Sequence, residues 1–155
     1  MSIKNTMIAV LAMVVSQVAM ASNMKVTNEV DANNIKQVGY ALICNNPAIS
    51  GQWNWINGKG LFAAQRRDIG TKLTGIYVGY VYNDGTQKYY YANVTQFSYM
   101  PTSSYPTGHL SFPMRIKSGG KVEIDYKASQ DYNLFPSTAT TTFTLDQIAK
   151  PDFVR

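Results

Sequence analysis

The chain has 155 residues, 45% of them hydrophobic and only 15% charged, and its formal net charge is +5. This length supports one domain with a hydrophobic core, and the composition excludes collagen, a coiled coil and a disordered tail. The single cysteine excludes an internal disulfide framework and a cysteine-built zinc site. The single histidine argues against a histidine-based metal cluster, so we expect no metal and no other cofactor.

The first 21 residues have the three-part form of a secretory signal peptide. Lys4 gives a positive start, residues 7–15 are uncharged and apolar, and residues 19–21 read Ala-Met-Ala, as at a cleavage site. The apolar stretch is shorter than the roughly 20 residues that a membrane-spanning helix needs. We therefore expect cleavage near Ala21, a single secreted domain over residues 22–155, and a periplasmic or extracellular location. The alternative is a retained N-terminal helix.

The charge distribution bears on the partners of the exported chain. Loss of residues 1–21 removes only Lys4, which leaves a net charge of +4, and Arg66-Arg67 is the only pair of adjacent basic residues. Nucleic-acid-binding proteins usually gather lysine and arginine on one face. We therefore expect no nucleic-acid partner, and at most a weak attraction to anionic cell surfaces.

One segment has the spacing of an amphipathic helix. Asp31, Asn33 and Asn34 are candidate N-caps, and Pro47 lies beyond the candidate end. Between them, apolar side chains recur at i, i+3, i+7 and i+8, at Ile35, Val38, Leu42 and Ile43. This pattern predicts a helix over residues 34–44.

Strand patterns follow the predicted helix. The expected strands cover residues 51–56, 61–66, 72–82, 87–97, 109–117, 121–127 and 138–144, and residues 145–149 are expected to form a short helical turn. Asn57-Gly58 predicts a tight hairpin, and Pro113 predicts an edge or a bulge in its strand. The order predicts an α+β fold with one amphipathic helix packed on an antiparallel sheet of about three hairpins.

Catalytic patterns are absent from the sequence. It has no Gly-x-Ser-x-Gly elbow, no His-Glu-x-x-His and no phosphate-binding loop. Glu123 and Asp125 share the outward face of a predicted strand, where solvated surface charges are the simpler interpretation than a catalytic pair. His109 has no neighbour in the sequence that suggests a base or a ligand. We therefore expect that the chain is not an enzyme.

The aromatic content points to sugar binding instead. Sugars present apolar C–H faces and hydroxyl groups, which exposed aromatic rings and amide side chains can match. Residues 52–57 place Trp53 and Trp55 on one face of a strand, beside three amide side chains. The alternative is that both tryptophans belong to the core of the sheet.

Two short motifs support this interpretation. Asn-Ile-Lys-Gln-Val-Gly at residues 34–39, followed after eleven residues by Gly-Gln-Trp at 51–53, resembles the mannan-binding lectin family of small oligomannose-specific lectins. The resemblance implies a helix packed on an antiparallel sheet and metal-free, non-catalytic binding of the mannose-containing core of N-glycans. The sugar contacts would come from Asp31, Asn33, Asn34, Gln52 and Trp53. The alternative is that the Gly-Gln-Trp segment supports the fold and holds no ligand.

A second cluster consists of tyrosines around the predicted hairpin of residues 72–97 and the loop after it. Its members are Tyr77, Tyr80, Tyr82, Tyr89, Tyr90, Tyr91, Tyr99 and Tyr105. One interpretation is a cross-strand ladder that stabilises the sheet. The other is an exposed aromatic surface for a cell-surface protein, which would make the chain an exported protein-interaction domain, either an inhibitor or a host-surface factor.

Overall fold

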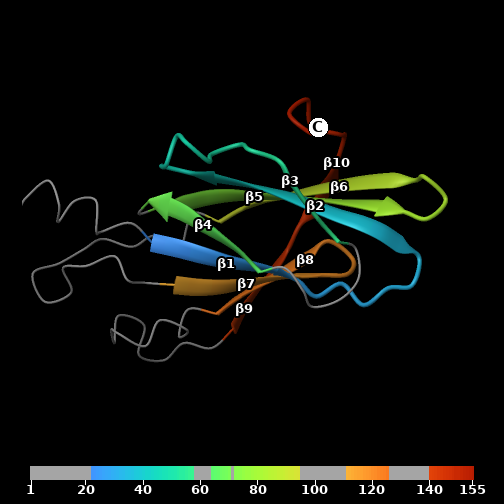
Figure 1. Ribbon diagram of the computed structural model, residues 1–155, viewed down its shortest axis with the longest axis horizontal. Coiled ribbons are helices and arrows are strands. Elements are labelled where there is room, and N and C mark those ends of the chain that lie inside the picture. The colour runs from blue at the N-terminus through green and yellow to red at the C-terminus, as the bar shows by residue number, and fades with distance from the viewer. Residues whose placement is uncertain (1–21, 58–63, 71, 95–110, 126–139) are drawn as a thin grey trace, which may run out of the picture.

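The chain forms two packed β-sheets. The computed structural model describes residues 22–57, 64–70, 72–94, 111–125 and 140–155. Within these ranges, two five-stranded sheets lie one above the other (Figure 1), with the strand orders β4-β1-β7-β8-β9 and β10-β6-β5-β2-β3. The strands are β1 (Ser22–Asn28), β2 (Ile35–Cys44), β3 (Asn54–Asn57), β4 (Gln65–Gly70), β5 (Leu73–Tyr82), β6 (Gln87–Asn93), β7 (Ser111–Lys117), β8 (Lys121–Asp125), β9 (Thr140–Thr144) and β10 (Asp146–Ile148).

The predicted α+β fold is wrong, because the described part of the chain contains no helix. The expected helix over residues 34–44 is strand β2, which pairs with β3 on one side and β5 on the other. The central residues of β2 are buried on both faces of the strand, so they form a nearly continuous apolar run. Such a run contains the i, i+3, i+7 spacing of a helix and also fits a buried strand. Gly39 in its middle disfavours a helix by about 1 kcal/mol relative to alanine.

Two further local predictions are wrong. The strands on either side of Asn57-Gly58 do not form a hairpin, because β3 pairs with β2 in the second sheet and β4 pairs with β1 in the first. The expected helical turn over residues 145–149 is instead β10, an edge strand paired with β6. The partners of β4 and β10 are far away in the sequence, where a local pattern carries no information about them.

Local turn chemistry predicts the other hairpins correctly. β5 and β6 pair across the Asn83-Asp84-Gly85 turn, and β7 and β8 pair across residues 118–120. Gly85, Gly119 and Gly120 have positive φ angles there, the backbone conformation that glycine adopts at least cost. Pro113 pairs with β1, whereas the pairs between β7 and β8 begin at Met114, so the proline occupies a one-sided part of a central strand.

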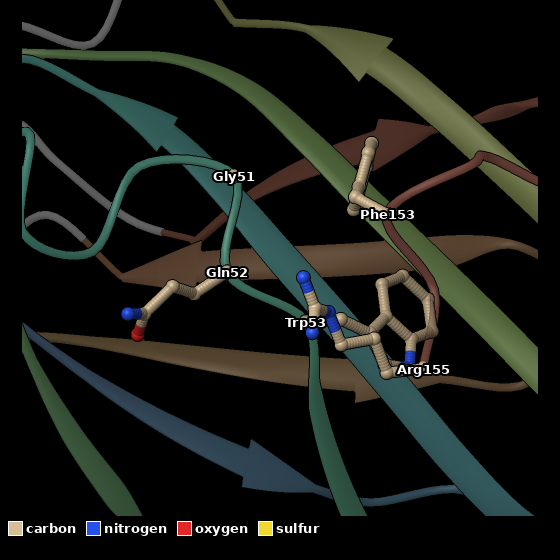
Figure 2. A pocket seen from close by; sticks show the side chains of 5 residues that line it. All are labelled: Gly51, Gln52, Trp53, Phe153 and Arg155. Atoms are coloured by element: carbon tan, nitrogen blue, oxygen red, sulfur yellow. The ribbon is translucent and has the colours of Figure 1, made fainter.

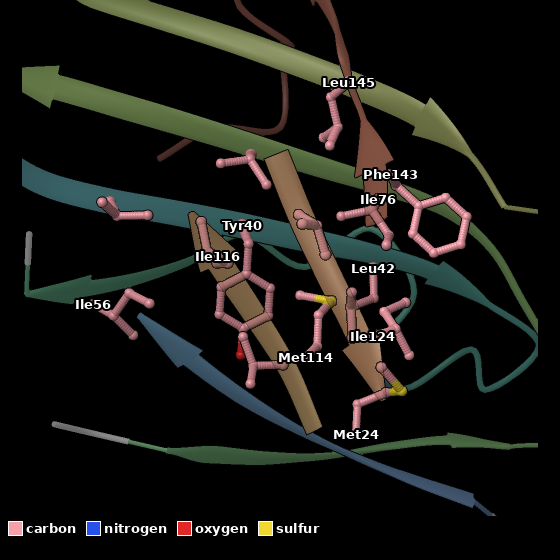
Figure 3. Packing of buried hydrophobic residues seen from close by; sticks show 14 of the residues in the cluster. Met24, Tyr40, Leu42, Ile56, Ile76, Met114, Ile116, Ile124, Phe143 and Leu145 are labelled. Atoms are coloured by element: carbon pink, nitrogen blue, oxygen red, sulfur yellow. The ribbon is translucent and has the colours of Figure 1, made fainter. Parts of the chain in front are cut away.

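The core lies between the two sheets. Inward side chains of both sheets form one buried cluster (Figure 3), including Met24, Tyr40, Leu42, Ile76, Met114, Ile116 and Ile124. Tyr40 and Tyr80 cross this core with polar ends. The Tyr40 hydroxyl donates to Gln65 at 2.5 Å, and the Tyr80 hydroxyl donates to the Lys117 carbonyl at 2.6 Å. Burial raises the pKa of Tyr40 to about 12 and also raises the pKa of Tyr80.

The opposite surface of the first sheet carries ion pairs. Lys117 lies 3.0 Å from Glu29, and Arg115 lies 3.3 Å from Glu123. These side chains are 20–35% exposed, so solvent screens the pairs and each stabilises the fold only slightly. In the described ranges, the structure contains no helix long and apolar enough to cross a membrane.

Candidate functional site

The outer face of the second sheet has a floor of glycines covered by aromatic rings. Gly39 of β2 and Gly79 of β5 face each other across the strand pair, and the Trp53 ring lies over both. A Cβ atom on Gly39 would lie 2.5 Å from Cζ2 of Trp53, which is closer than two carbon atoms can pack. These strands therefore need glycine so that the indole can lie flat on the sheet.

The rings of this face contact one another, and we call them the aromatic cluster: Trp53, Trp55, Tyr77, Tyr89, Tyr91 and Phe153. Trp53 meets Trp55 edge to face with ring centroids 5.3 Å apart, and meets Tyr89 at 5.8 Å. Tyr77 and Tyr91 pair across β5 and β6 at 4.5 Å. Such contacts contribute about 0.5–1.5 kcal/mol each beyond the burial of their area, so the cluster holds Trp53 in one orientation.

The C-terminal segment, residues 151–155, completes the cluster from above. The Phe153 ring packs against Tyr77 at 5.0 Å and against Trp53 at 6.2 Å. The Trp55 indole Nε1–H donates to the main-chain oxygen of Arg155 at 2.5 Å. The segment is therefore tied to β3 by a hydrogen bond and to β5 by a ring contact.

The loop between β2 and β3 presents Gln52 and Trp53. The Gly51 amide donates to the Leu42 carbonyl at 2.9 Å, and the Gln52 amide donates to the Ile49 carbonyl at 3.0 Å. Gly51 has a φ of +76°, which a residue with a side chain adopts only with strain. The loop thus turns back against the end of β2 before Trp53 leads into β3.

A half-open hollow of about 320 Å³ lies between this loop and the C-terminal segment. Gly51, Gln52, Trp53, Phe153 and Arg155 line it (Figure 2). Its volume falls at the lower end of the range for small-molecule sites, about 300–1,000 Å³. The combination of aromatic rings with one amide and one guanidinium suits a small polar ligand that also has an apolar face.

Two residues of the hollow have notable polar groups, the Gln52 amide and the Trp53 indole nitrogen. Arg67 of β4 donates to the Gln52 side-chain oxygen at 3.2 Å, and Figure 2 shows the Gln52 side chain extending away from Trp53 and Arg155. The Trp53 Nε1 atom is buried and has no hydrogen-bond partner within the described residues. A buried donor without a hydrogen-bond partner is uncommon in folded proteins. Here the close packing of the indole on the sheet offsets the loss of that hydrogen bond.

The five expected site residues fall into two separate groups. Gln52 and Trp53 line the hollow, but Asp31, Asn33 and Asn34 lie in the turn before β2. That turn contacts the β5–β6 hairpin, where the Asn83 amide donates to the Asn34 carbonyl at 2.8 Å. The Trp53 ring lies over Gly39, four residues along β2 from Ile35. At about 3.4 Å per residue, the turn lies roughly 14 Å from this ring.

The sequence interpretation missed Gly51, Phe153 and Arg155 at the hollow. The last two lie in the short C-terminal segment, which has no pattern of its own that indicates a site. One sequence signal did exist: Gly39, Gly75 and Gly79 lie inside strands, where glycine often marks the close approach of another group.

The tyrosines divide between the two faces of the hairpin, as alternation predicts. Tyr77, Tyr89 and Tyr91 belong to the outer aromatic cluster, whereas Tyr80 meets Tyr90 edge to face on the inner side at 5.6 Å. Tyr89 is only 3% exposed. The chain's own rings therefore cover much of this surface. Tyr99 and Tyr105 lie outside the described residues.

Few groups in the described chain could perform chemistry. Glu123 pairs with Arg115 and Lys117 on the first sheet, as expected for a surface charge. No group of three His, Cys, Asp or Glu side chains within the described ranges could hold a metal ion. Burial raises the pKa of the Cys44 thiol, so this cysteine is a poor nucleophile at neutral pH. His109 lies outside the described residues.

Comparison with known proteins adds no relative. No protein family, no curated protein and no solved structure matches this chain.

Proposed function

We propose that this chain is an exported, non-catalytic carbohydrate-binding domain whose binding site is the hollow between the β2–β3 loop and the C-terminal segment. The observation that carries the proposal is the lining of the hollow. It joins the half-buried rings of Trp53 and Phe153 to the exposed polar side chains of Gln52 and Arg155. An aromatic face packs against the C–H face of a sugar, while amide and guanidinium groups bind its oxygen atoms.

The rigidity of the site supports this proposal. Trp53 is fixed by the glycine floor below and by three rings around it, so binding would not have to order this side chain. Preorganised aromatic side chains give contact area at a low cost in conformational entropy. The tyrosine-rich hairpin is a weaker candidate for a protein partner, because its outer rings are already packed together.

Export and the ligand class remain parts of the proposal. β1 begins at Ser22, so cleavage near Ala21 would leave every described strand intact. Mannose-containing glycans belong among the ligands to test, because the Gly-Gln-Trp segment that resembles the lectin family lies at the hollow. The helix that the resemblance implied is absent from the described chain, and Asp31, Asn33 and Asn34 do not line the hollow.

The test is a glycan array probed with residues 22–155 in the absence of added metal. We expect selective binding that Gln52→Ala abolishes and Gln147→Ala preserves, since both are exposed glutamines and only Gln52 lines the hollow. Circular dichroism should show the same fold for all three proteins. A blank array from the folded wild-type protein would refute carbohydrate binding, and equal losses in the two variants would place the site elsewhere.

A further inference from the structure

We infer that the hollow selects an acidic sugar, one that carries a carboxylate or a sulfate, and that Arg155 binds this anionic group. The inference rests on the proposed function and names the class of glycan. Its basis is the pair of polar side chains that line the hollow, whose free groups are donors, and the guanidinium group of Arg155 at its rim.

The amide of Gln52 has a defined orientation. A guanidinium group has donors only, so the Gln52 oxygen must be the atom that faces Arg67. The Gln52 NH₂ group is then the end of the amide that Arg67 does not contact, and it can only donate. The exposed Arg155 side chain at the same hollow is also a donor only. A ligand at this rim therefore needs acceptor oxygens, which carboxylates and sulfates supply in excess.

None of the side chains that line the hollow is a carboxylate. Within the described residues, the side-chain ion pairs join Arg115 and Lys117 to carboxylates of the first sheet, and none involves Arg67 or Arg155. Asp152 is exposed in the turn before Phe153 but does not line the hollow. Hydrogen bonds between a guanidinium and an anion are about twice as strong as neutral ones.

The aromatic rings of the hollow favour an anionic sugar over a small free anion. A free anion would contact Arg155 but would leave Trp53 and Phe153 without a partner. A sugar ring can place its C–H face against an aromatic ring while its charged substituent points to the rim. The volume of about 320 Å³ is enough for a small ligand of this kind.

The test compares two arginine variants in calorimetric titrations with a uronic-acid oligosaccharide and its neutral counterpart. Arg155→Gln and Arg66→Gln each remove one positive charge from an exposed position, but only Arg155 lines the hollow. We expect Arg155→Gln to weaken binding of the acidic sugar about tenfold or more, the effect of one lost charge-assisted hydrogen bond. Arg66→Gln should change it less than about twofold, because this exposed side chain does not line the hollow and solvent screens its charge.

The possible outcomes distinguish failure of the acidic-sugar inference from failure of the proposed function. Equal binding of acidic and neutral sugars, or equal losses in both variants, would overturn the acidic selectivity while carbohydrate binding stands. Binding of polyglutamate as tightly as the acidic sugar would show that charge alone is recognised, which also overturns it. Failure of the folded protein to bind any glycan would overturn both. Retained binding of the neutral sugar by Arg155→Gln, together with the loss of the acidic one, would support the inference.

Discussion

Substitution of Gly39 by alanine should displace Trp53 from the sheet. The new Cβ atom would lie 2.5 Å from Cζ2 and 2.6 Å from Cε2 of the indole. Those are rigid ring atoms, held on the other sides by Trp55 and Phe153, so the overlap cannot be relieved by a small side-chain rotation. Overpacking of this kind costs about 1–3 kcal/mol.

The same change also returns some stability. Alanine is about 0.5–1 kcal/mol better than glycine within a strand, so the net loss should be at most about 2.5 kcal/mol. For a domain of this size, that corresponds to a fall in Tm of up to roughly 9 °C. Urea unfolding of residues 22–155 measures the free energy directly, with the slope of the transition as a check on two-state behaviour.

A double-mutant cycle isolates the cause. Trp53→Leu removes the ring but keeps an apolar side chain, so Gly39→Ala should be neutral or slightly stabilising in that background. Gly75→Ala is the matched control, because its Cβ would meet Tyr91 at 2.8 Å and not Trp53. Its cost should be the same with and without Trp53→Leu. If the costs of Gly39→Ala and Trp53→Leu simply add, the close packing of Trp53 on Gly39 is refuted.

Three further predictions concern other parts of the fold. Tyr80→Phe should cost about 1–3 kcal/mol in urea unfolding, because it leaves the Gly120 amide and the Lys117 carbonyl without the hydroxyl that bonds both; an unchanged midpoint would contradict this. Burial raises the pKa of Tyr40 to about 12, so the unfolded chain releases this proton first as pH rises above 10. Stability should then fall by up to about 1.4 kcal/mol per pH unit until pH 12, and Tyr40→Phe should flatten that decline. Trp55→Phe removes the hydrogen bond to Arg155, so carboxypeptidase should shorten the variant faster than the wild type while the circular dichroism spectrum is unchanged.

Sequence reasoning succeeded where the determining interactions are local. The β5–β6 hairpin and the 118–120 turn follow from turn residues that favour one backbone conformation. The shared face of Trp53 and Trp55 follows from the two-residue period of a strand. These features depend on a few consecutive residues, so the order of amino acids is enough to predict them.

It failed where the outcome depends on distant partners. The helical spacing of residues 34–44 is real, but two neighbouring strands supply the hydrogen bonds of β2. The core between the sheets buries one face of β2 and the aromatic cluster covers the other, and both favour the strand. Gln52 and Trp53 are predicted site residues that line the hollow, whereas Phe153 and Arg155 line it without having been predicted. Their position follows from packing on the aromatic cluster, and nothing in the sequence around Pro151 shows where that segment docks.

The hollow forms between segments that are far apart in the sequence, so it can form only late in folding. Trp55 and Arg155 are bonded although they lie 100 positions apart, and Glu29 and Lys117 are bonded across 88. Pairings between such distant segments form slowly, because the chain must close long loops before any contact stabilises them. During synthesis the hollow therefore stays incomplete until Arg155 has emerged and docked. A ligand that contacts both sides of the hollow can therefore bind only after residues 151–155 have docked on the aromatic cluster.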